Sequence, residues 1–275
     1  MKTRSITAAI AFFVFLPFLI FSNGYLWNVA IAIISGACMF EALCCIKIPG
    51  ALGLSIPTLG YAILLPLLCQ GEERTLSNGT SLFLFIIFAV GVLANNHFHT
   101  SQITLVAALC LFLTNSLTSL IIIRRQPFGL LLVILVLVIA WGSDTSAYIC
   151  GRLFGTRRLA AEISPKKTLE GSIGSLIITV ILAVVFGLIV NAFAWAEANL
   201  PMLAVLGFLG NIFAQMGDLI ASLFKRHYST KDFGTVFPGH GGFLDRFDSV
   251  IGVCVLMLLV ISRNDLLKIF SVYAA

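Results

Sequence analysis

The sequence predicts an all-α integral membrane protein: a polytopic bundle of about nine transmembrane helices with the N-terminus in the cytoplasm. Of its 275 residues, 59% are hydrophobic and only 11% are charged. So few charges cannot provide the polar surface of a soluble domain. The apolar runs are mostly about 20 residues long, which suits helices that cross a hydrocarbon layer roughly 30 Å thick. The alternation of apolar and polar residues expected of barrel strands is absent.

Residues 1–125 are expected to contain about five of these spans, as the N-terminal part of a single membrane domain. The first span follows Lys2 and Arg4. No small-residue cleavage site comes after it, so a retained helix is favoured over a signal peptide. A polar loop is expected at residues 70–80, and the other spans at about residues 25–46, 51–69, 81–94 and 103–123.

Three features of these N-terminal spans are interpreted as structural. Pro57 and Pro66 predict a kink in the third span. Glu41 lies near the end of the second span. A role as a site residue stays open for it, but solvation by lipid headgroups is favoured, because acids so close to the interface are more often solvated in this way. The seven cysteines have no CxxC spacing and predict neither a disulfide framework nor a metal site.

Residues 126–275 are expected to contain the chemistry, in four further spans with cytoplasmic loops at residues 156–170 and 226–241. The sixth span starts at about residue 130, and the later ones cover about residues 172–192, 202–224 and 242–262. Asp144 lies within the sixth. An acid inside a spanning helix costs about 2.5 to 3.5 kcal/mol on insertion scales unless it faces protein, water or an ion. Asp144 is therefore a candidate site residue.

The eighth span carries a polar stripe. Its members recur at intervals of four, three, four and three residues, which puts them on one helical face: Asn211, Gln215, Asp218, Ser222 and Lys225. Such a stripe has to face a cavity or a partner helix. The neighbouring Gly207, Gly210 and Gly217 would permit close helix approach. In the ninth span, Asp245 and Asp248 share a face with Ser249 in the first turns.

The distribution of basic residues predicts the orientation. The net charge of +5 is modest, and the Lys and Arg residues cluster between apolar runs, which favours a topological role over nucleic-acid binding. With nine spans and a cytoplasmic N-terminus, 12 of the 17 Lys and Arg residues lie inside, although the Arg124–Arg125 pair lies outside. This layout brings Asp144, Asp218 and Asp245 to the cytoplasmic side of the membrane.

The longest run that combines basic, acidic, glycine and histidine residues is SLFKRHYSTKDFGTVFPGHGGFLDRFD, at residues 222–248. It resembles the signature of phosphatidate cytidylyltransferases in all of its fixed positions: Ser222, Lys225-Arg226, Lys231-Asp232, Gly234, Phe237-Pro238, His240-Gly241-Gly242, Asp245-Arg246 and Asp248. DTSAY at 144–148 and SPKKTLEG at 164–171 resemble two further stretches of that family. One departure is Ser175, where a second glycine is expected after Gly174.

The resemblance implies transfer of a cytidylyl group from CTP to phosphatidate in the bilayer, giving CDP-diacylglycerol and pyrophosphate. Carboxylates near one membrane face suit Mg2+, a hard cation that prefers oxygen ligands and often keeps substrate phosphates in its shell. Basic side chains and glycine-rich backbone N–H groups suit the phosphates. The reaction needs little from a general base, because a phosphate monoester has its second pKa at about 6.

On this interpretation Asp218 and Asp245 are the principal Mg2+ ligands and Asp144 is a third acidic contributor; a second, monovalent cation is left open. The expected catalytic residues are Asp218, Asp245, Lys225, Arg246 and His240. Those expected to bind substrate are Asp144, Lys166, Lys167, Ser222, Arg226, Lys231, Gly241, Gly242 and Asp248. The expected location is the inner (plasma) membrane with the active site facing the cytoplasm, and small-residue helix faces would permit a homodimer.

Two other classes of protein remain open at this point. An ion-coupled transporter also places acids in the membrane, but it predicts charges at the midplane and inverted repeats, and no repeat of the last two spans is visible. A lipid kinase or a transferase acting on isoprenoid phosphates would use similar chemistry. A purely structural role, in which the charges only neutralise each other, would not require the glycines or the polar stripe.

Overall fold

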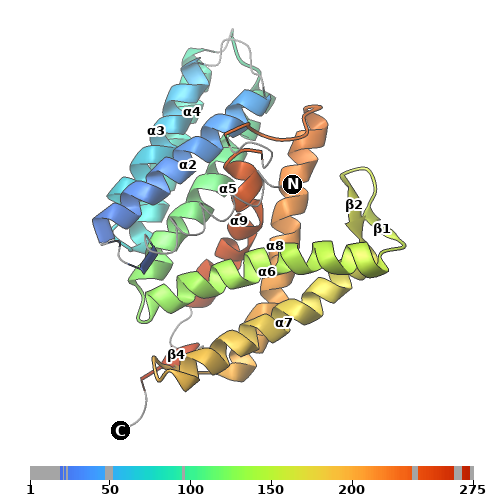
Figure 1. The fold of residues 1–275 in the computed structure, drawn as a ribbon. Coiled ribbons are helices and arrows are strands. Elements are labelled where there is room, and N and C mark those ends of the chain that lie inside the picture. Colours follow the sequence, from blue (N-terminus) through green and yellow to red (C-terminus); the bar gives the residue numbers. More distant parts are fainter. Residues whose placement is uncertain are drawn as a thin grey trace. The chain divides into compact units, whose positions relative to one another are not determined.

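The computed structural model describes residues 19–20, 22, 24–46, 52–94, 97–236, 241–262 and 268–272, and most of these are helical (Figure 1). The chain forms two compact units. Unit 1 comprises Met1–Arg125 and Tyr228–Arg246, and unit 2 comprises Gln126–His227 and Phe247–Ala275. Almost all of the expected first span lies outside the described residues, and so does His240.

Unit 1 is built on four helices that lie side by side (Figure 1): α2 (Gly24–Ile46), α3 (Leu52–Leu68), α4 (Glu73–Leu93) and α5 (Thr100–Arg125). Each corresponds to one of the expected spans. Some polar groups inside the bundle have partners on neighbouring helices, which matters where water is excluded. Trp27 Nε1 donates to the carbonyl of Leu120 at 3.3 Å, and the Tyr61 hydroxyl donates to Asn115 Oδ1 at 2.6 Å.

Helix α4 starts earlier than expected. The sequence predicted a polar loop at residues 70–80, but the helix begins at Glu73, so that prediction is wrong for most of the segment. Thr80, at the end of this segment, has partners within the bundle. Thr80 Oγ1 lies 3.0 Å from the hydroxyl of Tyr61 and accepts a hydrogen bond from Asn115 Nδ2 at 3.0 Å. A polar residue that is satisfied by a neighbouring helix can extend a span instead of ending it.

Unit 2 is built on α6 (Gly129–Phe154), α7 (Leu169–Ala192), α8 (Leu200–His227) and most of α9 (Leu244–Ile261), which begins in unit 1. The predicted close approach at glycines is confirmed. A Cβ on Gly207 would lie 2.9 Å from Val180 Cα of α7, and one on Gly217 would lie 3.1 Å from the backbone nitrogen of Gly252 in α9. Side chains at these positions would push the helices apart.

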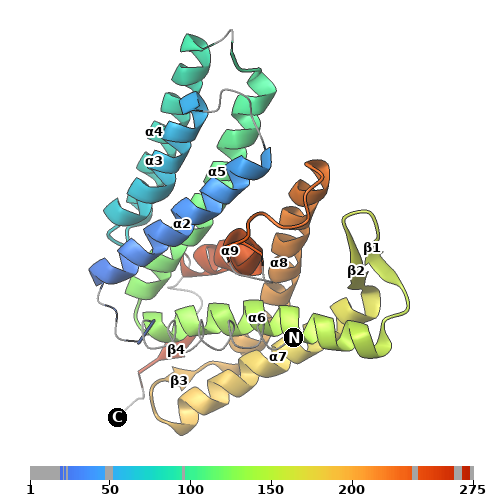
Figure 2. The ribbon, with the colours of Figure 1, turned by 45° about the horizontal axis from the view of Figure 1, so that its top comes forward.

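Two small antiparallel sheets add to the helices, so the all-α prediction is incomplete. The expected loop at 156–170 contains a hairpin of β1 (Arg158–Ala160) and β2 (Ser164–Thr168), and β3 (Glu197–Ala198) pairs with β4 (Phe270–Ser271). Figure 2 shows the hairpin beside the end of α6 and the start of α7. Glu170 closes its base, since its carboxylate accepts from the backbone N–H of Thr156 at 3.0 Å. Strand pairing satisfies the backbone N–H and C=O groups of these segments, which lie outside the helices.

Among the described residues, six helices are long and apolar enough to cross a membrane: α2, α4, α5, α6, α7 and α8. The outer face of α7 supports this, because Ile173, Ile177 and Ile181 recur every four residues and are more than half exposed. An exposed stripe of this kind is suited to lipid contact. The chain is therefore a multi-pass membrane protein; the count of nine spans and the orientation stay predictions.

Candidate active site

Three carboxylates from three helices meet in unit 2. Asp144 lies on α6, Asp218 on α8 and Asp248 on α9. The hydroxyl of Ser249 donates to Asp144 Oδ2 at 2.7 Å, and the N–H of the same residue donates to Asp248 Oδ1 at 2.8 Å. Asp248 is 7% exposed and interacts electrostatically with Asp218, Asp144 and Lys225. The structure thus brings together two of the expected metal ligands and a third acid that was expected only to contact substrate.

Two lysines accompany these acids. Lys167 forms an ion pair with Asp218 and lies 3.5 Å from the backbone carbonyl of Gln215. Lys225 is 8% exposed, although it is a basic residue in the last turn of α8. Charged groups are buried at this level only when they are paired or hydrogen bonded. Ser222 Oγ lies 3.5 Å from Asp218 Oδ1 of the same helix. Because Asn211, Ser222 and Lys225 are all buried, the predicted polar stripe of α8 faces the interior of unit 2.

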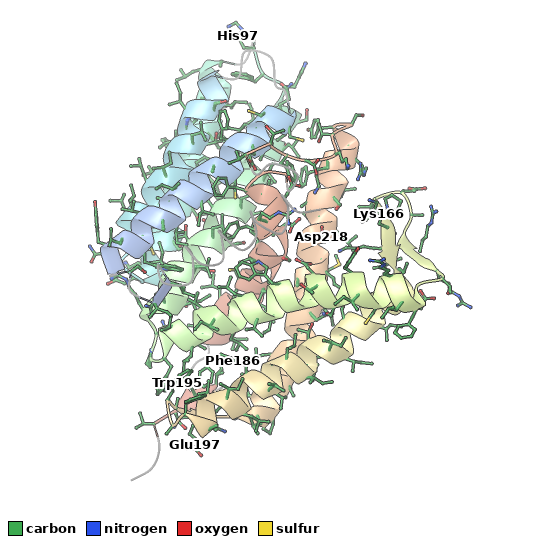
Figure 3. All side chains as sticks on the ribbon, viewed as in Figure 1. His97, Lys166, Phe186, Trp195, Glu197 and Asp218 are labelled. Atoms are coloured by element: carbon green, nitrogen blue, oxygen red, sulfur yellow. The ribbon has the colours of Figure 1, made fainter. Side chains whose placement is uncertain are left out.

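The two adjacent lysines of the SPKK stretch point in different directions. They lie on strand β2, where successive side chains alternate between faces. Lys167 is half-buried against Asp218, whereas Lys166 is exposed on the hairpin (Figure 3). The hairpin is held to the end of α8 by Arg226, whose Nε donates to the carbonyl of Ile163 at 3.2 Å. Of the two lysines, Lys167 is therefore the one positioned at the acidic cluster.

A buried network of polar side chains joins α6, α7 and α8 next to the acidic cluster. Asn211 is fully buried, and its Nδ2 lies 2.9 Å from Ser143 Oγ, 3.1 Å from Ser175 Oγ and 3.0 Å from Thr179 Oγ1. Its Oδ1 accepts from Gln215 Nε2 at 2.5 Å. The network joins α6, α7 and α8 at the positions next to Asp144 and Asp218. Ser175, the departure from the family pattern, contributes its hydroxyl to this network.

In unit 1, Asp245 organises the glycine-rich turn of the signature. Its Oδ2 accepts from the N–H groups of Phe233 at 2.9 Å and Gly242 at 3.0 Å. Gly241 has φ +83°, and a Cβ there would also lie 2.7 Å from Asp245 Oδ2. Only glycine adopts this conformation without strain. The N–H of Gly242, which was expected to meet a phosphate, donates to this carboxylate in the structure.

Glu41 of α2 is buried against the glycine-rich turn of the signature, an environment that the sequence did not predict. It is 5% exposed, so the expectation that lipid headgroups solvate it is wrong. Its Oε1 accepts from the N–H of Phe243 at 3.0 Å and its Oε2 from the N–H of Leu244 at 2.9 Å. These partners lie 202 and 203 residues away in the chain. The only signal in the sequence was an acid inside an apolar span.

The predicted site residues that the structure describes are divided between the two units. Unit 2 holds Asp144, Lys166, Lys167, Asp218, Ser222, Lys225, Arg226 and Asp248, and unit 1 holds Lys231, Gly241, Gly242, Asp245 and Arg246. Lys231 and Arg246 are exposed in the structure. Each unit therefore contributes its own part of the predicted constellation.

The donor set of unit 2 is of the type that Mg2+ prefers. The cluster offers carboxylate and hydroxyl oxygens, with no sulfur or imidazole among the atoms described above. Within the described part of the chain, no group of three or more His, Cys, Asp and Glu side chains is arranged as a ready-made metal site. Mg2+ is commonly held by one or two carboxylates together with substrate phosphates, so a complete protein cage is not required.

Comparison with known proteins places these features in a family. A model of the cytidylyltransferase family matches residues 2–263. The phosphatidate cytidylyltransferase of Bacillus subtilis is 32% identical over 277 residues, which covers 95% of this chain and 98% of the relative. Those of Staphylococcus haemolyticus and Staphylococcus saprophyticus are 32% and 33% identical, each covering 95% of this chain and 99% of the relative. The similarity includes both units and the residues 222–248.

Proposed function

The chain belongs to the cytidylyltransferase family, and we propose that it transfers the cytidylyl group of CTP to phosphatidate, giving CDP-diacylglycerol and pyrophosphate for phospholipid biosynthesis. The observation that carries this proposal is the cluster of Asp144, Asp218 and Asp248 with Lys167 and Lys225 in unit 2. Acids that can hold a cation and lysines that can hold phosphates are what a reaction between two anions requires.

The chemical step is an in-line displacement at phosphorus. A phosphate oxygen of phosphatidate attacks the α-phosphorus of CTP; the new P–O bond forms while the bond to pyrophosphate breaks, and pyrophosphate leaves with the electron pair. The nucleophile is already largely ionised near neutrality, with a second pKa of about 6, so the protein need not supply a strong base. Its main task is to offset the repulsion between the two anions. In this proposal the positive side chains of Lys167 and Lys225 in unit 2 and of Arg246 in unit 1 bind phosphate groups and thereby reduce that repulsion.

Lys167 is suited to exchange partners when substrate arrives. It is paired with Asp218 in the structure, and in the proposed reaction its ammonium group moves to an incoming phosphate. That exchange would leave the Asp218 carboxylate free to hold a metal ion. The backbone beside it is held, because Thr168 caps α7 by accepting from the N–H of Gly171 at 3.1 Å. The side chain can therefore move while the strand stays in place.

Mg2+ is the cofactor in this proposal. Asp218 and Asp144 are the proposed ligands in unit 2, and Asp245 is the proposed ligand in unit 1. When bound, it neutralises the triphosphate and stabilises the leaving pyrophosphate. The oxygen donors of unit 2 support this choice of cation. The bias of Lys and Arg residues supports a cytoplasmic site on the inner membrane, since cytoplasmic segments of membrane proteins carry the excess of basic residues.

The direct test is CTP-dependent pyrophosphate release by the purified protein in detergent, with and without phosphatidate and Mg2+, while the lipid product is followed by mass. We expect release only with all three components, together with CDP-diacylglycerol. An Asp218→Asn variant purified in parallel controls for contaminating enzymes and should be inactive. Turnover with another lipid phosphate but not with phosphatidate would refute the named substrate, and silence with every lipid phosphate would refute the transferase assignment.

A further inference from the structure

Helix α9 begins with backbone N–H groups that have no acceptor inside the helix. Every α-helix leaves its first N–H groups without intrahelical partners, and the positive end of the helix dipole lies there. Here two carboxylates supply the acceptors. Asp245 takes the N–H of Gly242, and Glu41 takes those of Phe243 and Leu244. The amides of the two residues before α9 and of its first residue are thus held by acids, and one of these acids comes from helix α2, about 200 residues earlier in the chain.

Glu41 also accounts for two glycines of the signature. The three atoms nearest to a Cβ placed on Gly242 all belong to the Glu41 carboxyl group, and the same side chain supplies the three nearest to a Cβ placed on Gly234. Neither glycine has a positive φ that would require glycine on conformational grounds. Gly241 does have one, and the atoms nearest to its Cβ belong to Asp245. Space for Glu41 is therefore the reason for glycine at 234 and 242.

We infer that Glu41 is a positioning residue for the transfer reaction: its buried carboxylate fixes the backbone of Phe243 and Leu244 and so sets where α9 presents Asp245 and Arg246. The inference deepens the proposed function and rests on it. Asp245 follows Leu244 directly, so a shift in the amide of Leu244 carries the Asp245 carboxylate with it. Displacement of reacting groups by about 1 Å can cost on the order of 100-fold in rate.

The first arm of the test compares Glu41→Gln with a matched control, Glu197→Gln. Glutamine keeps the size of Glu41 but replaces one acceptor oxygen by an NH2 group that cannot accept from Phe243 or Leu244. Glu197 is exposed on β3 of unit 2, at the end away from the hairpin (Figure 3). We expect kcat to fall at least about tenfold in Glu41→Gln, with a smaller change in KM for CTP, and to stay at the wild-type value in Glu197→Gln.

The second arm is a double-mutant cycle between Glu41 and Gly242, with both the apparent Tm and kcat as readouts. Gly242→Ala should strongly lower both the Tm and kcat in the wild-type background, because the new methyl group would collide with the Glu41 carboxylate. In the Glu41→Ala background the carboxylate is absent, so Gly242→Ala should lower the Tm and kcat only slightly further. Gly241→Ala is the matched control. An alanine there is strained by the positive φ of residue 241 and not by Glu41, so this substitution should lower the Tm and kcat equally in both backgrounds.

These arms separate the failure of the inference from the failure of the proposed function. Wild-type kcat in Glu41→Gln, measured well below its Tm, would overturn the positioning role even if the Tm fell. Equal costs of Gly242→Ala in both backgrounds would overturn the steric argument. The Tm arm of the cycle needs no substrate, so it still reports on Glu41 if the wild-type protein proves inactive with CTP and phosphatidate.

Discussion

Replacing Asn211 by alanine is expected to destabilise unit 2 by about 2 kcal/mol. The side chain is fully buried; its NH2 group shares two hydrogens among the hydroxyls of Ser143, Ser175 and Thr179, and its Oδ1 accepts from Gln215, which makes three hydrogen bonds. Hydrogen bonds between membrane helices average about 0.6 kcal/mol each in double-mutant cycles, and three of them give this sum. The hydroxyl of Ser175 keeps a second partner, the carbonyl of Ser172 at 2.9 Å, so part of the network survives the substitution.

The measurement is thermal unfolding in detergent, followed by the fraction of protein that stays monodisperse after heating. A loss of about 2 kcal/mol corresponds to a fall in Tm of about 4 to 8 °C for a protein of this size. Ile212→Ala is the control, because Ile212 is the next residue of α8 and is exposed; its side chain is expected to leave lipid or detergent rather than a packed interior. A fall in Tm for Asn211→Ala no larger than that for Ile212→Ala would refute the reasoning.

Three further predictions concern the reaction. Asp245→Asn should abolish pyrophosphate release yet leave the protein monodisperse in detergent, because both described backbone bonds end on one oxygen, Oδ2, whose place an amide oxygen can take; near-normal release would contradict the metal assignment. Lys167→Met should lower kcat/KM for CTP by about 100-fold, and Lys166→Met by less, since only Lys167 contacts Asp218; equal losses would count against the role given to the ion pair. Chelation by EDTA should stop turnover and added Mg2+ should restore it, whereas turnover that persists in EDTA would exclude the metal-assisted mechanism.

Much of the fold could be predicted because hydropathy and helical period are properties of consecutive residues. The eight helices that the described residues form correspond to expected spans, and the stripe from Asn211 to Lys225 faces inward as its spacing required. Spacing of three and four residues defines a helical face whatever surrounds it. The limits of α4 were missed for a related reason: Thr80 is polar in the sequence, but Tyr61 and Asn115 satisfy it in the fold.

The divergence of Lys166 and Lys167 needed more than local pattern. Both lysines lie in one basic loop of the sequence, and charge alone treats them as equivalent. Hairpin pairing places them on strand β2, where alternation turns one toward Asp218 and the other outward. Short strands of this length have weak signals in a sequence, because three to five residues give little room for alternation to be recognised.

The sequence alone was sufficient for the membrane class, for most of the helices and for the family, because composition, apolar length and a signature of 27 consecutive residues can all be read without knowing what touches what. It could not say which residues far apart in the chain meet. Glu41 is an isolated acid until α2 packs against the start of α9, and Gly234 and Gly242 are unexplained glycines until its carboxylate fills the space beside them. Buried carboxylates and amides need partners, and the folded chain alone determines which ones they find.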